Sequence, residues 1–251
     1  MAEPAILTAD GSPTRYHPDY QQHYHSLSGA HMEARLRYVV PGRIIETARQ
    51  RGQVRILDVG FGLGTNVAWA IHELQKQVPG AELEIVSIER EILPVAALVC
   101  HFKAYPEMRL AVLLREMVEK GESRDRNLRL QLRLGEAENE IETIDGPFHA
   151  VFLDPFSPAS NPEPWKSSFL AAIRKRTAQG GILTTYSSAR SVRLALLEAG
   201  WQIGEGPAVG TKSSGTVASS GSVTPPLPPI AEKLNRKLQR LLETGTEGED
   251  R

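Results

Sequence analysis

The feature that most constrains this chain is the segment 54–66, which reads V-R-I-L-D-V-G-F-G-L-G-T-N. A short, mostly apolar run comes first and predicts a buried strand. Gly60, Gly62 and Gly64 follow at alternate positions and predict a tight turn that leads into a helix. Because glycine lets the backbone approach a ligand closely, and the first N–H groups of a helix are unpaired, this edge can bind a nucleotide.

The spacing of the glycines bears on which nucleotide fits. The pattern is G-x-G-x-G, whereas the dinucleotide fingerprint is G-x-G-x-x-G. Asp58 ends the strand, and we expect its carboxylate to disfavour a pyrophosphate and to favour a cationic ligand. S-adenosyl-L-methionine carries a sulfonium and an ammonium group and meets that condition. The alternative is a turn that only connects a strand to a helix.

Composition excludes several classes of protein. The chain has 251 residues, a formal net charge of −1 and ordinary proportions of apolar and charged residues, so we expect one large domain with extensions. Cys100 is the single cysteine, which excludes an internal disulfide and a multi-cysteine zinc site. No apolar run approaches the ~20 residues that span a bilayer, and the N-terminus lacks a secretory signal. We expect a cytoplasmic protein that binds neither a metal nor a membrane.

Strand and helix patterns alternate from residue 53 onward, which predicts a mostly parallel, doubly wound α/β sheet. The expected strands are 54–57, 83–88, 128–134, 148–153, 182–186, 201–203 and 215–219, with 121–127 as an exposed charged loop. We divide the chain into a hairpin and helical extension (1–52), a Rossmann-like core (53–219) and a Pro-rich linker, short helix and disordered tail (220–251).

Acidic residues follow three of these strands, at the edge where such sheets bind ligands. Glu89 is placed to accept hydrogen bonds from ribose hydroxyls. Glu136 is placed to accept from the exocyclic amine of an adenine, or simply to interact with a helix N-terminus.

Asp154 ends a strand within Asp154-Pro155-Phe156, which resembles the Asp/Asn-Pro-Pro-Tyr/Phe motif of enzymes that methylate exocyclic amines of bases. A carboxylate and the Pro155 carbonyl can orient the N–H bonds of an amine and help its proton leave. Phe156 can stack on a planar base. The alternative is a proline-stiffened Asx turn with Phe156 in the core.

Positive charge is densest near the N-terminus, at Arg35, Arg37, Arg43, Arg49, Arg51 and Arg55. We favour a solvated helix face, and a phosphate-contacting patch is the alternative. Lys212 is a further phosphate candidate, although an ordinary hairpin lysine is the more common case. Tyr24 and His25 precede a predicted helix, where they can close over the cofactor site, and a structural histidine with satisfied hydrogen bonds is the alternative for His25.

Together these residues resemble the methyltransferase domain of the MnmC family of tRNA-modifying enzymes, including its stand-alone DUF752 relatives. The resemblance runs over about residues 6–219 and is most specific in the D-x-F-x-P-x-x-N-P-x-x-W pattern of residues 154–165. It implies a class I methyltransferase fold with a seven-stranded sheet and a small N-terminal extension.

The resemblance also implies a reaction. The chain would use S-adenosyl-L-methionine to convert 5-aminomethyl-(2-thio)uridine to 5-methylaminomethyl-(2-thio)uridine at the tRNA wobble position. Asp154 would be the catalytic carboxylate and Phe156 would line the base pocket. The cofactor would be surrounded by Gly60, Gly62, Gly64, Asn66, Glu89, Glu136, Glu33 and Tyr24.

No FAD-dependent oxidase domain follows in this sequence, so we expect a separate enzyme to supply the aminomethyl group. The alternatives are methylation of a small-molecule amine or another nucleic acid, and a non-catalytic domain that binds S-adenosylmethionine or RNA.

Overall fold

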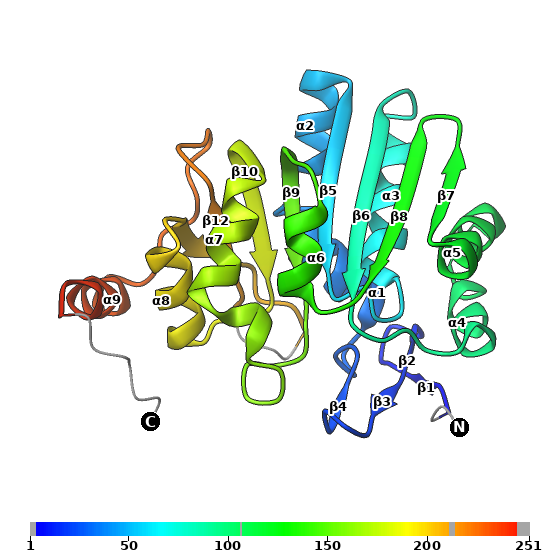
Figure 1. Ribbon diagram of the computed structural model, residues 1–251, viewed down its shortest axis with the longest axis horizontal. Coiled ribbons are helices and arrows are strands. Elements are labelled where there is room, and N and C mark those ends of the chain that lie inside the picture. Colours follow the sequence, from blue (N-terminus) through cyan, green and yellow to red (C-terminus); the bar gives the residue numbers. More distant parts are fainter. Residues whose placement is uncertain (1–3, 106, 211–213, 245–251) are drawn as a thin grey trace.

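A computed structural model describes residues 4–105, 107–210 and 214–244 and is dominated by an eight-stranded sheet (Figure 1). The strand order is β11-β12-β10-β9-β5-β6-β8-β7. The strands are β5 (Gln53–Val59), β6 (Glu82–Glu89), β7 (Glu122–Asp125), β8 (Leu128–Leu134), β9 (Phe148–Leu153), β10 (Thr177–Thr185), β11 (Gln202–Glu205) and β12 (Thr216–Ser219).

The five central strands, from β10 to β8, pair in parallel, and the strands at both edges pair antiparallel. This arrangement confirms the expected α/β fold, but the sheet has eight strands instead of seven. The additional strand is β7, in the segment expected to be a loop. It folds back on β8, and Ser123 is buried opposite Leu130. Pairing with β8 therefore outweighs the polar composition of this segment.

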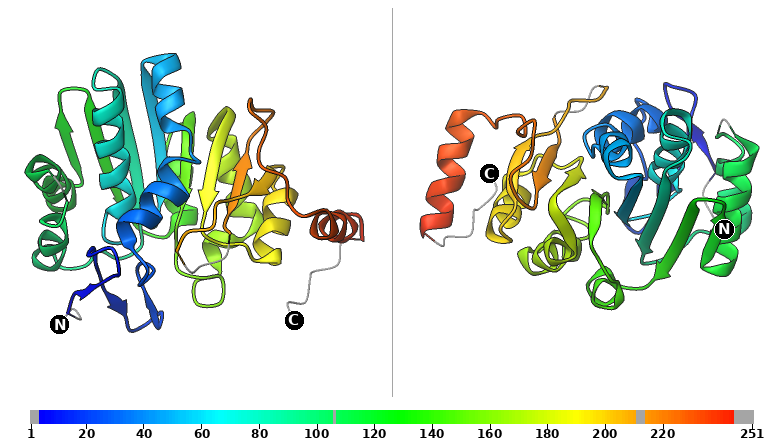
Figure 2. Two further views of the ribbon diagram at one scale, coloured as in Figure 1. Left: turned by 180° about the vertical axis from the view of Figure 1, so that it is seen from behind. Right: turned by 90° about the horizontal axis from the view of Figure 1, so that it is seen from above.

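Helices cover both faces of the sheet (Figure 2). One apolar core lies beneath α2 (Ile44–Arg51), α3 (Thr65–Gln77), α4 (Val95–Phe102) and α5 (Met108–Lys120). The other lies beneath α6 (Ala137–Thr143), α7 (Ser167–Lys175) and α8 (Arg190–Glu198). Ile56 packs into the first core and its neighbour Leu57 into the second, as expected for a central parallel strand buried on both faces.

The first part of the N-terminal extension, residues 4–33, lies at the carboxyl ends of the central strands (Figure 1). Its first hairpin, β1 (Ile6–Leu7) and β2 (Pro13–Thr14), has Asp10 and Gly11 in its turn. A second hairpin, β3 (Tyr16–His17) and β4 (Gln22–His23), was not predicted. Helix α1 (Ala30–Glu33) continues into a π-helix, η1 (Ala34–Val39).

The chain after β12 packs along the β11 edge of the sheet. The Pro228 carbonyl accepts a hydrogen bond from the Glu205 N–H of β11 at 2.9 Å. Helix α9 (Glu232–Thr244) then lies against α8, where Leu238 is fully buried. The expected tail after α9 lies outside the described residues. None of the described helices has the length and apolar character needed to cross a bilayer.

Candidate active site

The glycine turn after β5 has a backbone conformation that favours glycine. Gly60, Gly62 and Gly64 have φ angles of +91°, +53° and +75°. A Cβ at Gly60 would lie 2.7 Å from the carbonyl oxygen of Asp154, and a Cβ at Gly62 would lie 3.1 Å from the ring of Tyr24. The turn therefore passes close to the Asp154 loop and to the N-terminal extension because it carries no side chains.

A cavity opens beside this turn, at the carboxyl ends of the central strands. Its walls include every residue that the family resemblance assigned to the site except Gly64, namely Tyr24, Glu33, Gly60, Gly62, Asn66, Glu89, Glu136, Asp154 and Phe156. Gly64 instead shapes the start of α3, where a Cβ would lie 2.8 Å from the ring of Phe61. Residues from five separate parts of the chain thus meet at the predicted edge of the sheet.

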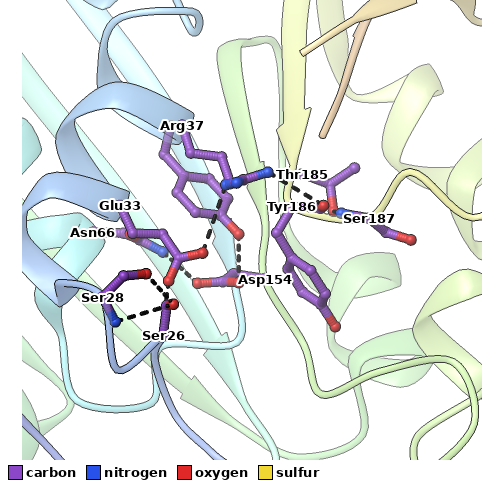
Figure 3. A network of polar contacts seen from close by, with 10 residues as sticks. Ser26, Ser28, Glu33, Arg37, Asn66, Asp154, Thr185, Tyr186 and Ser187 are labelled. Atoms are coloured by element: carbon purple, nitrogen blue, oxygen red, sulfur yellow. Dashed lines mark hydrogen bonds and ion pairs between the residues drawn. The ribbon is translucent and has the colours of Figure 1, made fainter. Parts of the chain in front are cut away.

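The carboxylate of Asp154 is held in place by two side chains. Its Oδ1 accepts a hydrogen bond from the Tyr38 hydroxyl, and its Oδ2 accepts one from Asn66 Nδ2 at 2.8 Å (Figure 3). Burial and the nearby Asp154 charge raise the pKa of Tyr38 well above its usual value, so its hydroxyl remains a donor. Asp154 is therefore a fixed hydrogen-bond acceptor on the cavity wall. Sequence reasoning missed Tyr38, which no motif marks.

A second polar network holds the loop that carries Asp154 and Pro155. Arg37 is buried, lies 3.6 Å from the Glu33 carboxylate and donates to the Tyr186 carbonyl at 3.4 Å (Figure 3). The Tyr186 hydroxyl donates to the Pro155 carbonyl at 3.0 Å, and burial raises the pKa of Tyr186. The π-helix η1 turns both Arg37 and its neighbour Tyr38 inward, and such helices are frequent at functional sites.

Glu89 lies at the rim, beside the glycine turn. Its carboxylate accepts hydrogen bonds from the backbone N–H groups of Gly62 at 2.8 Å, Arg90 at 2.8 Å and Glu91 at 3.3 Å. Burial raises the pKa of Glu89. Glu136 is 49% exposed on the same rim and pairs with Arg90 at 3.0 Å. Both carboxylates are placed where a nucleoside in the cavity would meet them.

Phe156 lies on the cavity wall among aromatic side chains of the N-terminal extension. The ring of Tyr20 stacks on it with a centroid distance of 4.2 Å and an interplanar angle of 19°. His17 and Tyr24 lie against it at 5.2 Å and 5.3 Å. Trp165 Nε1 donates to the Phe156 carbonyl at 2.9 Å and anchors the loop. His17 and Tyr20 were not predicted, although the density of aromatic residues between 16 and 25 was a usable signal.

Asp58 does not line the cavity, so the expectation that it faces a cationic ligand is wrong. It is 1% exposed beneath the turn and accepts a hydrogen bond from the Ser87 hydroxyl of β6 at 2.8 Å. Burial raises its pKa to about 7. Asp58 lies within β5, which continues to Val59, so its side chain points to the face of the sheet opposite Leu57 and Val59 and not towards the turn.

The N-terminal arginines are largely engaged within the protein. Arg35 pairs with Glu73 at 2.8 Å, and Arg55 pairs with Glu84 at 2.7 Å. Arg37 is buried in the network described above. These contacts agree with a structural role for much of this region and weaken the alternative of a phosphate-contacting patch. Lys212 lies outside the described residues.

Comparison with known proteins gives consistent results. A family model described as "S-adenosyl-L-methionine-dependent methyltransferase" matches residues 103–221. The chain is similar to the crystal structure of MNMC2 from Aquifex aeolicus, with 38% sequence identity and a TM-score of 0.82. The match covers 95% of this chain and 76% of the Aquifex chain.

Two curated relatives are also similar. The bifunctional protein MnmC of Pseudomonas fluorescens, named for tRNA 5-methylaminomethyl-2-thiouridine biosynthesis, is 33% identical over 64% of this chain and 26% of its own length. The uncharacterized protein MJ0670 of Methanocaldococcus jannaschii is 31% identical over 85% of this chain and 58% of its own. The chain therefore spans about a quarter of the first relative and somewhat over half of the second.

Proposed function

Because the chain belongs to the MnmC-type family of S-adenosyl-L-methionine-dependent methyltransferases, we propose that it methylates a wobble uridine of tRNA. The substrate would carry a 5-aminomethyl group, with or without 2-thiolation, and the product would be the 5-methylaminomethyl base. The observation that carries this proposal is the Asp154 carboxylate, held by Tyr38 and Asn66 on a cavity wall beside Phe156. The tRNA substrate implies a cytoplasmic location.

The cavity residues fit the cofactor. Gly60 and Gly62 line the cavity with backbone alone, and the Glu89 carboxylate lies beside them, where it accepts a hydrogen bond from the Gly62 N–H. We assign Glu89 to the ribose hydroxyls and Glu136 to the adenine amine, with Asn66 beside the turn. Glu33 and Tyr24 close the site from the N-terminal extension. When bound, S-adenosylmethionine supplies a methyl group already activated by its positively charged sulfur.

The residues of the chain then have two tasks. Phe156 presents a flat ring on which a uracil can stack. Asp154 would accept hydrogen bonds from the amine and align its lone pair. It would also take up the proton that the nitrogen loses as it gains the methyl group, while the bond from the cofactor sulfur to that methyl group breaks and leaves a neutral thioether. The Pro155 carbonyl has a second lone pair available beside its bond to Tyr186. Much of the rate enhancement should come from holding two reactants in line.

The test is methyl transfer from labelled S-adenosylmethionine to tRNA with and without the 5-aminomethyl group, followed by mass spectrometry of the nucleosides. We expect 5-methylaminomethyluridine, and only from the aminomethylated tRNA. Methylation of a different nucleoside, or of a polyamine but not of the tRNA, would refute the proposal. Cofactor binding without transfer to any of these substrates would favour the non-catalytic alternative.

A further inference from the structure

Helix α9 carries its positive charge on one flank. Lys233, Arg236, Lys237 and Arg240 have the spacing i, i+3, i+4, i+7, which aligns them along one side of a helix. All four are exposed. At 1.5 Å per residue the stripe is about 10 Å long. Helix α9 carries these four basic residues and two acidic ones, so its net charge is +2, whereas the net charge of the whole chain is −1.

The apolar residues of α9 fix the orientation of this stripe. Leu238 is fully buried and Leu234 and Leu241 are half-buried, on the side that contacts α8. The helix therefore cannot rotate its charged flank away without exposing Leu238. Its apolar face is also occupied by the protein, which argues against insertion of α9 into a lipid surface.

The charges of the stripe are available to a partner. Arg236 lies 3.7 Å from Glu232, and both side chains are mostly exposed, so this pair is weak. Within the described ranges, Lys233, Lys237 and Arg240 form no ion pair. The N-terminal arginines differ, because Arg35, Arg37 and Arg55 are engaged with acidic residues of the protein.

The position of α9 suits a substrate that also reaches the cavity. The helix lies beyond α8, near the end of the sheet at which the central strands have their carboxyl ends (Figures 1 and 2). The cavity with Asp154 opens at that same end. A substrate the size of a folded RNA can contact both places, whereas a nucleoside or a small amine cannot.

We infer that the exposed flank of α9 binds the phosphate backbone of the tRNA whose wobble base enters the cavity. This inference rests on the proposed function, which makes tRNA the substrate. Contacts from lysine and arginine to phosphates position a nucleic acid without reading its sequence and make binding depend on salt. Helix α9 thus supplies affinity and register, and the cavity supplies the recognition of the base.

The test is a full-length variant that carries Lys233→Gln, Arg236→Gln, Lys237→Gln and Arg240→Gln. The control removes four exposed charges at the opposite edge of the sheet, with Arg115→Gln, Lys120→Gln, Arg124→Gln and Arg129→Gln. The measurements are the KM for aminomethylated tRNA, the binding of fluorescently labelled tRNA between 50 and 200 mM salt, and the affinity for S-adenosylmethionine.

We expect the α9 variant to raise the KM and the dissociation constant for tRNA about tenfold or more, and to lower the salt slope by about two or more. Its kcat at saturating tRNA, its cofactor affinity and its melting temperature should match those of the control. If the wild type methylates tRNA and the α9 variant has the same KM and salt slope, the inference is overturned and the proposed function stands.

The opposite result is also informative. If the wild type binds tRNA more tightly than the α9 variant but does not methylate the aminomethyl base, the proposed reaction fails and α9 remains an RNA-binding surface. If the α9 variant loses binding to vesicles of anionic phospholipid that the wild type binds, while its tRNA binding is unchanged, the partner of α9 is a membrane and the inference is overturned.

Discussion

Replacement of Asp58 by asparagine should make the stability of the protein less dependent on pH. Asp58 is fully buried beneath the glycine turn, and one of its carboxylate oxygens has no hydrogen-bond partner among the residues that the structure describes. Burial raises its pKa from 3.8 to about 7. The folded protein therefore binds the Asp58 proton more tightly than the unfolded chain does. The resulting contribution to the free energy of unfolding is fully present below about pH 4 and is lost as the pH rises towards 7.

The size of the effect follows from the two pKa values. As the pH rises from 5 to 8, ionisation of a group with these two pKa values lowers the free energy of unfolding by about 2.5 kcal/mol. Asparagine has the same shape but does not ionise, and the Ser87 hydroxyl can still donate to its oxygen. The asparagine variant should therefore gain about 2.5 kcal/mol relative to the wild type over this range, whatever its stability at pH 5.

The assay is urea unfolding of the wild type and the Asp58→Asn variant at several pH values from 5 to 8. His101, whose pKa burial lowers to about 4, has the opposite pH dependence, but both proteins contain it and its contribution cancels. The exposed Asp145→Asn variant is the matched control and should follow the wild type. A constant difference between wild type and Asp58→Asn at every pH would show that Asp58 is ionised in both states and refute the reasoning.

Three further predictions concern the site and α9. Asp154→Asn should lower kcat roughly 100- to 10,000-fold without changing the affinity for S-adenosylmethionine, and a rate above about a tenth of wild type in a single-turnover assay would contradict its role. Glu89→Gln should weaken cofactor binding about tenfold in calorimetry, since it removes one charged hydrogen-bond acceptor, and an unchanged affinity would reject the ribose assignment. Leu238→Ala should destabilise the packing of α9 on α8 by about 2–5 kcal/mol and release the helix, because a helix of 13 residues is only marginally stable alone. Unaltered hydrogen-exchange protection over residues 232–244 would disprove this prediction.

Much of the fold could be predicted because its signals are local. The apolar run and glycines of residues 54–66 specify a strand, a turn and a helix within a single window of sequence. The strand β7 could not be predicted this way, since Glu122, Arg124 and Asp125 are charged and only their pairing with β8 makes them a strand. Contacts that one segment makes with another are not visible in its own composition, even here, where only two residues separate β7 from β8.

The same limit applies to the site. Asp154, Phe156 and Glu89 follow strands, so the geometry of a parallel sheet brings them to one edge. Tyr38 reaches Asp154 from a helix 116 positions away in the sequence, and a π-helical turn that the sequence does not announce directs it there. The prediction for Asp58 was wrong because β5 does not end there but continues to Val59, so the alternation of side chains along the strand buries Asp58 beneath the sheet face.

The stack of Tyr20 on Phe156 has a consequence for admission to the site. A uracil can lie against this face of Phe156 only after Tyr20 leaves it, so one aromatic contact is exchanged for another of about 1–3 kcal/mol. A flexible alkylamine offers no ring and cannot compensate for the lost contact. Under the proposed function, the β3–β4 hairpin would therefore favour a planar base over a flexible polyamine.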